Sequence, residues 1–451
     1  MSHDTNRRDF LKATTAAGVG FWAAAGAQAE ESKSANERIR FACIGVGGKG
    51  SSDSKDASRN GDVVAICDID DNILGKAEKT FEGAKKYNDF RKLLDEMGPN
   101  IDAVTISTPD HTHAAATLMA MRMGKHCYTQ KPLTHAIYEA RRLGDVAREM
   151  KVVTQMGNQG TANFGLRQAA ATVKSGALGN VKEVHVWTNR PVWAQGDGRP
   201  PEAEVPTGVH WDLWIGPAAY RSYAVGYHPF SWRGYWDFGT GALGDMACHT
   251  MNMPYMALDL QHPTSVEAQT SGHNNETYPS WSIIKFEFPA TDKRPALSMT
   301  WYDGKKLPPF ELFEKVKWPT EANKDGPKKD KAEKFETAIS GALLIGDKAS
   351  LYSPGDYADK FYLPEGMEKP KLDLERPPYH FTEFANAIKE GKQPTSNFPN
   401  YSGPLTEIVL LGNLAVWSGK KIDWDAKALK ATGAPELDAM IRPTYREGYT
   451  L

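Results

Sequence analysis

Short apolar runs alternate with longer amphipathic segments between residues 38 and 157. The apolar runs have the length of strands, and they are "RIRFACIGV", "DVVAICDID", "IDAVTISTP", "KHCYTQKP" and "KVVTQMGN". The segments between them, such as "HAAATLMAMRMG" and "HAIYEARRLGDVAREM", have the length and spacing of helices. Strands separated by helix-length segments predict a parallel sheet wound in right-handed βαβ units. We therefore expect an α/β domain over residues 38–157.

The pattern changes in the second part of the chain. Successive apolar and aromatic runs predict strands, in "VEAQTSG", "WSIIKFEFPA", "RPALSMTWYDG" and "GALLIGDKASLYSPG". Residues 314–334 are charged and interrupted by Pro and Gly, which predicts a solvated insertion loop. Two amphipathic helices are predicted within residues 379–420. We expect a second, α+β domain over residues 158–425 and a tail over residues 426–451.

The first 29 residues have the pattern of an export signal. Arg7 and Arg8 form a twin-arginine pair, a weakly apolar stretch follows, and residues 27–29 have the small-x-small form of a cleavage site. The apolar stretch is too short to span a bilayer, which needs about 20 strongly apolar residues. The order of these elements resembles a Tat signal, whose pathway exports folded proteins. A disordered basic start with an Ala-rich helix is the alternative. We predict a periplasmic protein and leave residues 1–29 out of the fold.

Composition and charge exclude several classes of function. Apolar residues make up 40% of the chain and charged residues 24%, which is ordinary for a soluble globular protein. The formal net charge of -2 gives no support to non-specific binding of nucleic acid or of anionic membranes. No segment after the signal is apolar enough to cross a membrane.

Cysteine and histidine spacing argue against a metal site. The four cysteines contain no CxxC, so we expect buried, reduced thiols rather than a zinc ribbon or a thioredoxin-like motif. The twelve histidines include no H-x-x-x-H pair. No metal is predicted, although His249 beside Cys248 keeps zinc from being fully excluded.

A glycine motif after the first strand predicts a dinucleotide site. Gly45, Gly47 and Gly50 complete G-x-G-x-x-G, and Gly48 lies inside the same turn. Asp68 ends the next strand, where a carboxylate binds both ribose hydroxyls and repels a 2′-phosphate. NAD is therefore favoured over NADP. A glycine turn in some other α/β fold is the alternative.

Polar residues follow two further strands of this sheet. "TPDHTH" ends one and "YTQKPLTH" ends the next, and open α/β sheets bind ligands at the carboxyl ends of their strands. We therefore expect Pro109 and Lys131 to line a nicotinamide pocket. His113, or His111, is expected to touch nicotinamide ribose or substrate, although polar residues at a helix start are as common.

The chain resembles the Gfo/Idh/MocA oxidoreductase family. The resemblance rests on the glycine motif, Asp68, "YNDFRKLLDE", "STPDHTHAAATLMAMRMGKHCYTQKP", "FTEFANAIKEGKQPTSNF", and the pair Asp245 and His249, which are four residues apart. It implies a Rossmann domain followed by a domain with a large open, mostly antiparallel β-sheet. It also implies helices that pack back on the Rossmann domain and a homo-oligomer formed through the open sheet.

The resemblance also assigns roles to residues of the site. It implies that Lys131 positions and polarises the reacting hydroxyl, that His249 is the general acid or base, and that Asp245 lies beside it. A structural histidine and a solvated strand-end lysine are the alternatives. The family's Glu-Lys-Pro stands here as Gln130-Lys131-Pro132, so Gln130 keeps hydrogen-bonding capacity at the cofactor but loses the charge.

Further residues are weaker candidates for substrate contact. Asn158 and Gln159 end a predicted strand near the domain junction. Trp232, Arg233, Tyr235 and Trp236 precede the helix of Asp245, and aromatic faces stack well on sugar rings. Core aromatics beside a surface arginine are the alternative.

Three functions remain open at this point. The first is an NAD-dependent oxidoreductase that acts on a secondary hydroxyl or ketone of a sugar, inositol or glycoside. The second is a glycoside-cleaving enzyme that oxidises, eliminates and reduces with the same NAD. The third is a non-catalytic NAD-binding protein. An exported NAD enzyme has no free cofactor pool, so we expect a tightly bound cofactor and a redox-neutral cycle.

Overall fold

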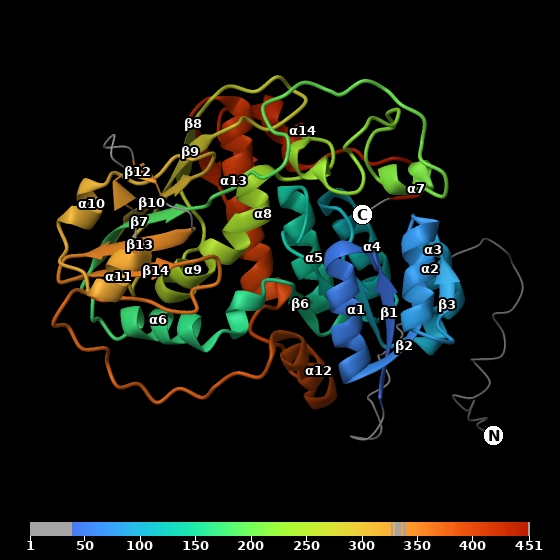
Figure 1. Cartoon of the computed structure of the whole chain (residues 1–451), viewed down its shortest axis with the longest axis horizontal. Coiled ribbons are helices and arrows are strands. Elements are labelled where there is room, and N and C mark those ends of the chain that lie inside the picture. Colours follow the sequence, from blue (N-terminus) through green and yellow to red (C-terminus); the bar gives the residue numbers. More distant parts are fainter. Residues whose placement is uncertain (1–37, 326–327, 330–334, 337–339, 450–451) are drawn as a thin grey trace, which may run out of the picture.

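The computed structural model describes residues 38–325, 328–329, 335–336 and 340–449 of the chain. The predicted export signal lies outside these residues. The described part forms two domains side by side, with the N-terminal one in blue and teal in Figure 1. Within it, no helix is both long and apolar enough to cross a membrane.

The N-terminal domain is a parallel sheet between two layers of helices. Its strand order is β3-β2-β1-β4-β5-β6, and every neighbouring pair is parallel. The strands are β1 (Ile39–Ile44), β2 (Gly61–Cys67), β3 (Lys85–Tyr87), β4 (Ala103–Ile106), β5 (His126–Thr129) and β6 (Thr154–Met156). The helices are α1 (Gly48–Asn60), α2 (Asp71–Thr80), α3 (Phe90–Met97), α4 (Asp110–Arg122) and α5 (Ile137–Met150). The predicted Rossmann fold is confirmed.

The apolar pattern explains why this sheet is buried on both faces. All four residues of β4 are buried, and β1 is buried along almost its whole length. Such strands read as continuous apolar runs because helices cover both sides. β3 has the sequence "KKY" and lies at the sheet edge, so it has no such run and the hydrophobic pattern does not reveal it.

The second domain is built on a sheet in the order β14-β13-β7-β10-β9-β8-β15-β16. Its strands are β7 (Val181–Trp187), β8 (Ser265–Thr270), β9 (Ser282–Phe288), β10 (Leu297–Tyr302), β13 (Gly341–Gly346), β14 (Ser350–Pro354), β15 (Ile422–Asp425) and β16 (Lys430–Ala431). Only the pairing of β7 with β10 is parallel among these. The expected mostly antiparallel sheet is therefore confirmed.

Helices connect the two sheets. α13 (Gly403–Ser418) packs against α5 on one side and against α8 (Gly241–Thr250) and β8 on the other (Figure 1). Arg141 on α5 holds the Glu407 carboxylate on α13 through two hydrogen bonds of 2.7 Å. α12 (His380–Glu390) packs against α1. These contacts fix α8 relative to the Rossmann strand ends.

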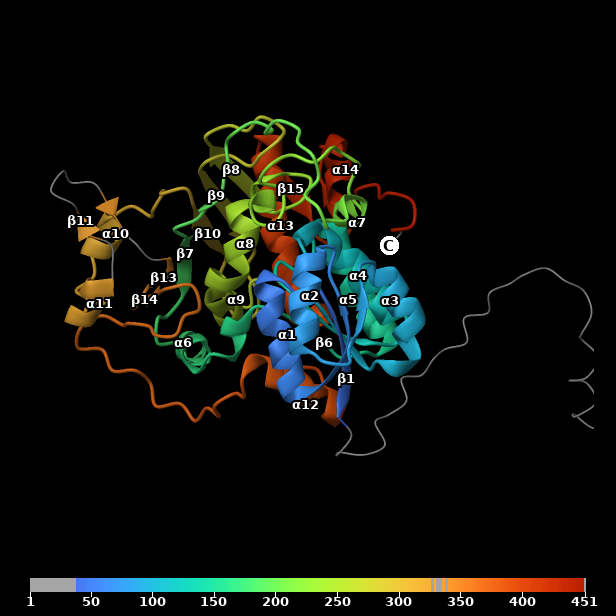
Figure 2. The ribbon, with the colours of Figure 1, turned by 45° about the vertical axis from the view of Figure 1, so that its right-hand side comes forward.

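The predicted insertion loop contains structure where it is described. α10 (Glu311–Glu314) and α11 (Thr320–Asp325) lie over one end of the second sheet (Figure 2). Phe313 on α10, Ala322 on α11 and Trp318 between the two helices are buried in one cluster with Trp187 and Tyr352. The segment is thus a partly buried cover rather than wholly a solvated loop.

Candidate active site

A cavity of about 420 Å³ runs along the carboxyl ends of the Rossmann strands and into the second domain. Its lining includes most of the sequence-predicted residues, namely Gly45, Gly47, Gly48, Asp68, Pro109, Gln130, Lys131, Gln159, Trp232, Arg233, Asp245 and His249. Both domains therefore contribute to one site, because Asp245 and His249 on α8 line the same cavity as the Rossmann strand ends. A second hollow beside α10 and α11 contains none of these residues.

The glycine turn leaves room for a close backbone approach. Gly45 has a φ of 76°, and a Cβ there would lie 2.6 Å from the Ser107 carbonyl oxygen. A Cβ on Gly50 would lie 1.9 Å from the Gly45 carbonyl oxygen. Gly50 therefore lets α1 pack onto the turn, while Gly45, Gly47 and Gly48 line the cavity at the start of α1. This cradle fits a pyrophosphate at a helix N-terminus.

Asp68 lies at the end of β2 with its carboxylate held by the backbone. Its Oδ2 accepts a hydrogen bond from the Val46 N–H at 3.0 Å, and its Oδ1 accepts one from the Asp70 N–H at 3.1 Å. Burial raises the pKa of Asp68. Each carboxylate oxygen accepts more than one hydrogen bond, so the group also fits ribose hydroxyls.

Lys131, Asp245 and Arg233 form a charged group deeper in the cavity. The Lys131 ammonium, just past β5, donates to Asp245 Oδ1 at 2.7 Å. Arg233 Nε lies 3.5 Å from the same oxygen. Burial acts to raise the pKa of Asp245, but the charges of Lys131 and Arg233 outweigh it and the net pKa is lowered. Asp245 is therefore a carboxylate that holds two cations at the site.

His249 follows one helical turn after Asp245 on α8. The side chain is buried, and its Nδ1 has no hydrogen-bond partner among the described residues. Its ring meets the Tyr357 ring edge-on, with centroids 4.8 Å apart. Burial and the Lys131 charge lower the pKa of His249 well below its usual value. His249 is therefore a neutral imidazole in the cavity wall, with one buried ring nitrogen that has no partner among the described residues.

Asp110 belongs to the cavity lining, and sequence reasoning overlooked it. The side chain is buried at the start of α4, and the Thr240 hydroxyl donates to its Oδ2 at 2.5 Å. Burial raises the pKa of Asp110 to about 6. Its position directly after Pro109, at a strand end, is the signal that was available.

The histidines that follow Asp110 point elsewhere. His113 has Nδ1 2.8 Å from the Pro132 carbonyl oxygen and Nε2 2.8 Å from that of Thr108. His111 is held in the same way by the carbonyl oxygens of Phe238 and Trp214. Burial lowers the pKa of both to about 4. These rings connect the strand ends to α4 and to the second domain, and neither lines the cavity.

Two of the proposed substrate residues also lie away from the cavity. Asn158 is fully buried, and its Oδ1 accepts from the Ser396 hydroxyl at 2.5 Å. Trp236 donates to the Thr277 carbonyl oxygen and packs on Tyr278. Trp232 and Arg233 do line the cavity, with the guanidinium 4.3 Å from the Trp232 ring centroid.

Among the lining residues that the sequence did not indicate, three come from loops that follow strands of the second sheet. Arg190 lies after β7, and Asp356 and Tyr357 lie after β14. Asp356 Oδ1 is buried and, within the described chain, has no hydrogen-bond partner. These residues come from loops, where neither periodicity nor a motif predicts position. Together with Trp232 they add polar and aromatic surface to the cavity, and Tyr357 contacts His249.

Metal ligands do not gather in the described residues. No group of three His, Cys, Asp or Glu side chains there has the arrangement of a metal site. The four cysteines are buried and unpaired, as expected. Cys248 is a buried residue of α8, and burial raises its thiol pKa to about 12.

Family models match both domains. The oxidoreductase family with an NAD-binding Rossmann fold matches residues 39–158, and its C-terminal alpha/beta domain matches residues 165–293. Together the two matches cover more than half of the chain.

Individual relatives match over shorter stretches. Levoglucosan dehydrogenase of Pseudarthrobacter phenanthrenivorans is 24% identical over 42% of this chain and 40% of its own length. The scyllo-inositol 2-dehydrogenase (NAD(+)) of Bacillus subtilis is 27% identical over 32% of this chain and 42% of its own length. The chain thus spans less than half the length of these curated relatives.

Solved structures share the fold over most of the chain. The WlbA dehydrogenase of Bordetella pertussis, in complex with NADH and UDP-GlcNAcA, has a TM-score of 0.60 at 15% identity and covers 86% of this chain and 99% of its own. The aldose-aldose oxidoreductase of Caulobacter crescentus has a TM-score of 0.59 at 14% identity and covers 86% of this chain and 100% of its own. At these identities the likeness establishes the fold.

Proposed function

Because the chain belongs to the Gfo/Idh/MocA oxidoreductase family, we propose that it moves hydride between NAD and a secondary hydroxyl or ketone of a sugar, an inositol or a glycoside. One observation carries this proposal. The neutral His249 and the Lys131–Asp245 pair line the same cavity as the glycine turn and Asp68. The substrate class is supported by the levoglucosan and inositol dehydrogenases among the relatives.

The chain's own residues supply the proton chemistry. Bound NAD supplies a nicotinamide that accepts or returns hydride. His249 takes the hydroxyl proton, because its neutral imidazole lines the cavity one helical turn from the Asp245 that holds Lys131. The Lys131 ammonium stabilises negative charge on the substrate oxygen, and Asp245 keeps that ammonium in place.

Substitutions at the site test this function. Lys131→Ala and His249→Ala should each lower the single-turnover rate at which sugar reduces bound NAD by about 10²- to 10⁴-fold, the usual contribution of one acid–base or charge-stabilising group. His262→Ala is the matched control, since His262 is exposed and lies outside the cavity. Unchanged rates in both site variants would refute the assignment.

We further propose that the cofactor stays bound and that the cycle is redox-neutral. A segment of the second domain supports this, because it closes over the cavity beside Asp68. The Asp71 N–H donates to the Gly208 carbonyl oxygen, and the His210 N–H donates to that of Ile69, both at 2.9 Å. His228 Nε2 lies 3.2 Å from Asp70 Oδ2. We call residues 206–228 the clasp.

The C-terminal residues strengthen this clasp. Arg446 pairs with Asp212 at 2.6 Å, and Asp212 lies on α7 (Trp211–Ile215) within the clasp. Tyr449 lines the cavity beside Phe90, with ring centroids 6.2 Å apart. Figures 1 and 2 both show this red segment running beside α7. A nucleotide in the cavity would be enclosed from both domains.

Purification without added nucleotide tests cofactor retention. The protein should release stoichiometric NAD(H) when it is denatured, and mass spectrometry would detect it. A protein that releases no nucleotide would contradict retention. His228→Ala should lose nucleotide faster on dilution, because it removes the contact to Asp70. His262→Ala again serves as the control.

Glycoside cleavage is the second candidate, and Asp110 favours it. Elimination of an aglycone from a keto sugar needs one group to remove a proton and another to donate one to the leaving oxygen. Asp110, with a pKa raised to about 6, is a suitable donor in the same cavity as His249. An aryl glycoside should then release its phenol with no net change in NADH. A stable keto sugar with accumulated NADH would favour simple oxidation instead.

Export through the Tat pathway fits a retained cofactor, since that pathway carries folded proteins. We propose a periplasmic location on the basis of Arg7 and Arg8. Replacing both arginines by lysine should leave the protein, with its leader uncleaved, in the cytoplasmic fraction. Equal amounts in the periplasm would contradict the proposal.

A further inference from the structure

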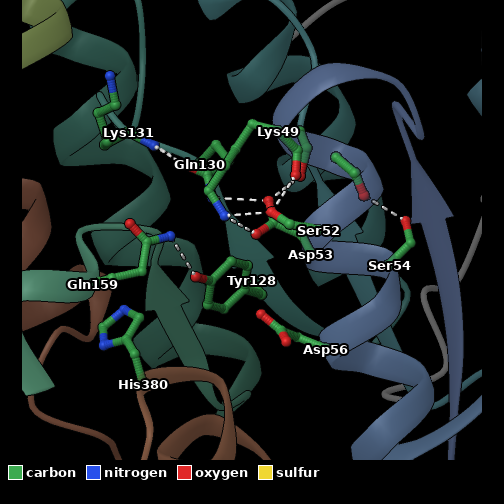
Figure 3. A network of polar contacts seen from close by, with 12 residues as sticks. Lys49, Ser52, Asp53, Ser54, Asp56, Tyr128, Gln130, Lys131, Gln159 and His380 are labelled. Atoms are coloured by element: carbon green, nitrogen blue, oxygen red, sulfur yellow. Dashed lines mark hydrogen bonds and ion pairs between the residues drawn. The ribbon is translucent and has the colours of Figure 1, made fainter.

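Beneath the glycine turn lies a buried carboxylate that the proposed reaction does not use. Asp53 is on α1, one turn after Gly50, and its side chain is 1% exposed. It accepts hydrogen bonds from the Gln130 Nε2 and from the Ser107 hydroxyl, each at 2.8 Å, and from the Lys49 ammonium (Figure 3). The donors come from the end of β5, the end of β4 and the start of α1.

The hydrogen bonds fix which way Gln130 faces. Its amide nitrogen must donate to Asp53, so its oxygen points away from that carboxylate and towards the backbone N–H of Lys131, at 3.4 Å. Gly157 makes room for the side chain, because a Cβ there would lie 2.4 Å from Gln130 Nε2. The orientation of the residue directly before Lys131 is therefore determined by Asp53.

The same contact explains why position 130 is not a glutamate. A glutamate there would place two carboxylates at hydrogen-bond distance inside the protein, and two such groups cannot both be ionised. The family resemblance implies a glutamate at this position. In this chain the carboxylate lies instead at Asp53 on α1, in contact with the Gln130 amide.

We propose that Asp53 is a positioning residue that supplies this relocated charge, and that the Asp53–Gln130 pair holds Lys49 and Lys131 in place along the cofactor cavity. Lys49 lines the cavity beside the glycine turn, and Lys131 lines it at the substrate end. The part of the inference that concerns Lys131 rests on the proposed function. The coupling between positions 53 and 130, and its effect on nucleotide binding, does not depend on any substrate.

A double-mutant cycle on the whole mature protein tests the proposal. The variants are Asp53→Asn, Gln130→Glu and the two combined, and the readouts are the melting temperature and the dissociation constant for added NAD after bound nucleotide is removed. Gln130→Glu alone should weaken NAD binding about tenfold or more, because it brings a second buried carboxylate into contact with Asp53. The double variant should recover to within about threefold of the wild type, because an asparagine amide at position 53 donates to the new carboxylate.

Asp56→Asn is the matched control on the same helix. Asp56 is also buried, but it pairs with Arg59 at 2.7 Å and accepts from the Tyr379 hydroxyl at 3.2 Å. It should not rescue Gln130→Glu. Rescue by Asp56→Asn, or a double variant as impaired as the two single effects combined, would overturn the proposal.

A pH series provides a readout that a purely structural role would not move. In Gln130→Glu the two carboxylates should share one proton, so its binding defect should shrink as pH falls and grow as pH rises. The other groups that face Asp53 are Lys49 and Asp56 on α1, Cys43 on β1, Tyr128 on β5 and Tyr379 before α12. Burial raises the pKa of Cys43, Tyr128 and Tyr379, so these three stay neutral through the neutral range.

His249→Ala separates this inference from the proposed function. His249→Ala should abolish sugar oxidation. In that background, the coupling between positions 53 and 130, measured by the dissociation constant for NAD, should be unchanged. If the wild type oxidised no sugar but the cycle still showed coupling, the proposed function would fail and the Asp53–Gln130 coupling would stand. If sugar oxidation were found without coupling, the reverse would hold.

Discussion

Asp110 shows how strongly one buried carboxyl responds to its surroundings. Its folded pKa, about 6, lies above the value of about 4 of an unfolded aspartate. The folded state therefore binds a proton more tightly than the unfolded state does between these values. Ionisation of Asp110 then costs stability progressively as pH rises from about 4 to about 6.

Asp110→Asn should remove this pH-dependent cost. The Thr240 hydroxyl can still donate to an amide oxygen, so the local hydrogen bond is kept. The variant should gain stability relative to the wild type as pH rises through this range, by at most about 3 kcal/mol for a shift of about two units. Urea unfolding at pH 4 and at pH 7 measures the difference. Equal differences at both pH values would show that Asp110 does not titrate in this way.

The sequence predicted the site residues that belong to motifs, but not those that lie on loops. Lys131 follows a strand and Asp245 lies one helical turn before His249, so their positions follow from local spacing. Asp356 and Tyr357 reach the cavity only because β14 ends beside α8 in the folded molecule. Trp236 was predicted from its neighbours Trp232 and Arg233, but its ring packs on Tyr278 in the interior.

At the scale of elements, the junction between the glycine turn and α1 is the tightest point of the nucleotide site. Gly50→Ala should abolish NAD binding, because its Cβ would overlap the Gly45 carbonyl oxygen at 1.9 Å. Gly75→Ala is the matched control, since nothing lies within 4 Å of a Cβ at that position on α2. The control should raise stability by about 0.5–1 kcal/mol. Calorimetric titration with NAD and thermal unfolding test both variants, and normal binding by Gly50→Ala would contradict the close packing.

The elements themselves were predictable to different degrees. The buried Rossmann strands were found because they are continuous apolar runs. β3, at the sheet edge, was not found because its sequence "KKY" contains no apolar run. The charged stretch containing α11 concealed a helix, because Trp318 and Ala322 are widely spaced among exposed residues. Its packing against Trp187 depends on the second sheet, which local sequence does not reveal.

At the scale of the whole molecule, the outer face of the second sheet is the expected oligomer surface. Away from α10 and α11 this face carries the exposed charges of Glu183, Glu267 and Lys285, together with the half-buried Glu287. An interface through such a face would be sensitive to salt and to charge reversal. The expectation of a homo-oligomer comes from the family resemblance.

Light scattering of the mature chain tests the expected assembly. The protein should be larger than a monomer, and Lys285→Glu should shift it towards the monomer by placing like charges together beside Glu287. Lys79→Glu on α2 is the control, because that exposed lysine lies on the other domain. A monomeric wild type would refute assembly through this sheet.

The clasp has a consequence for the order of assembly. Residues 206–228 pair with the loop after β2, and Tyr449 reaches the same place from the end of the chain. A nucleotide beside Asp68 must therefore enter before these segments dock, or wait for them to open. Synthesis proceeds in the same direction, since the Rossmann domain emerges before the clasp, and Tyr449 emerges after both. Loading during folding should accordingly be faster than loading a finished molecule, because segments made later close a pocket that has already formed.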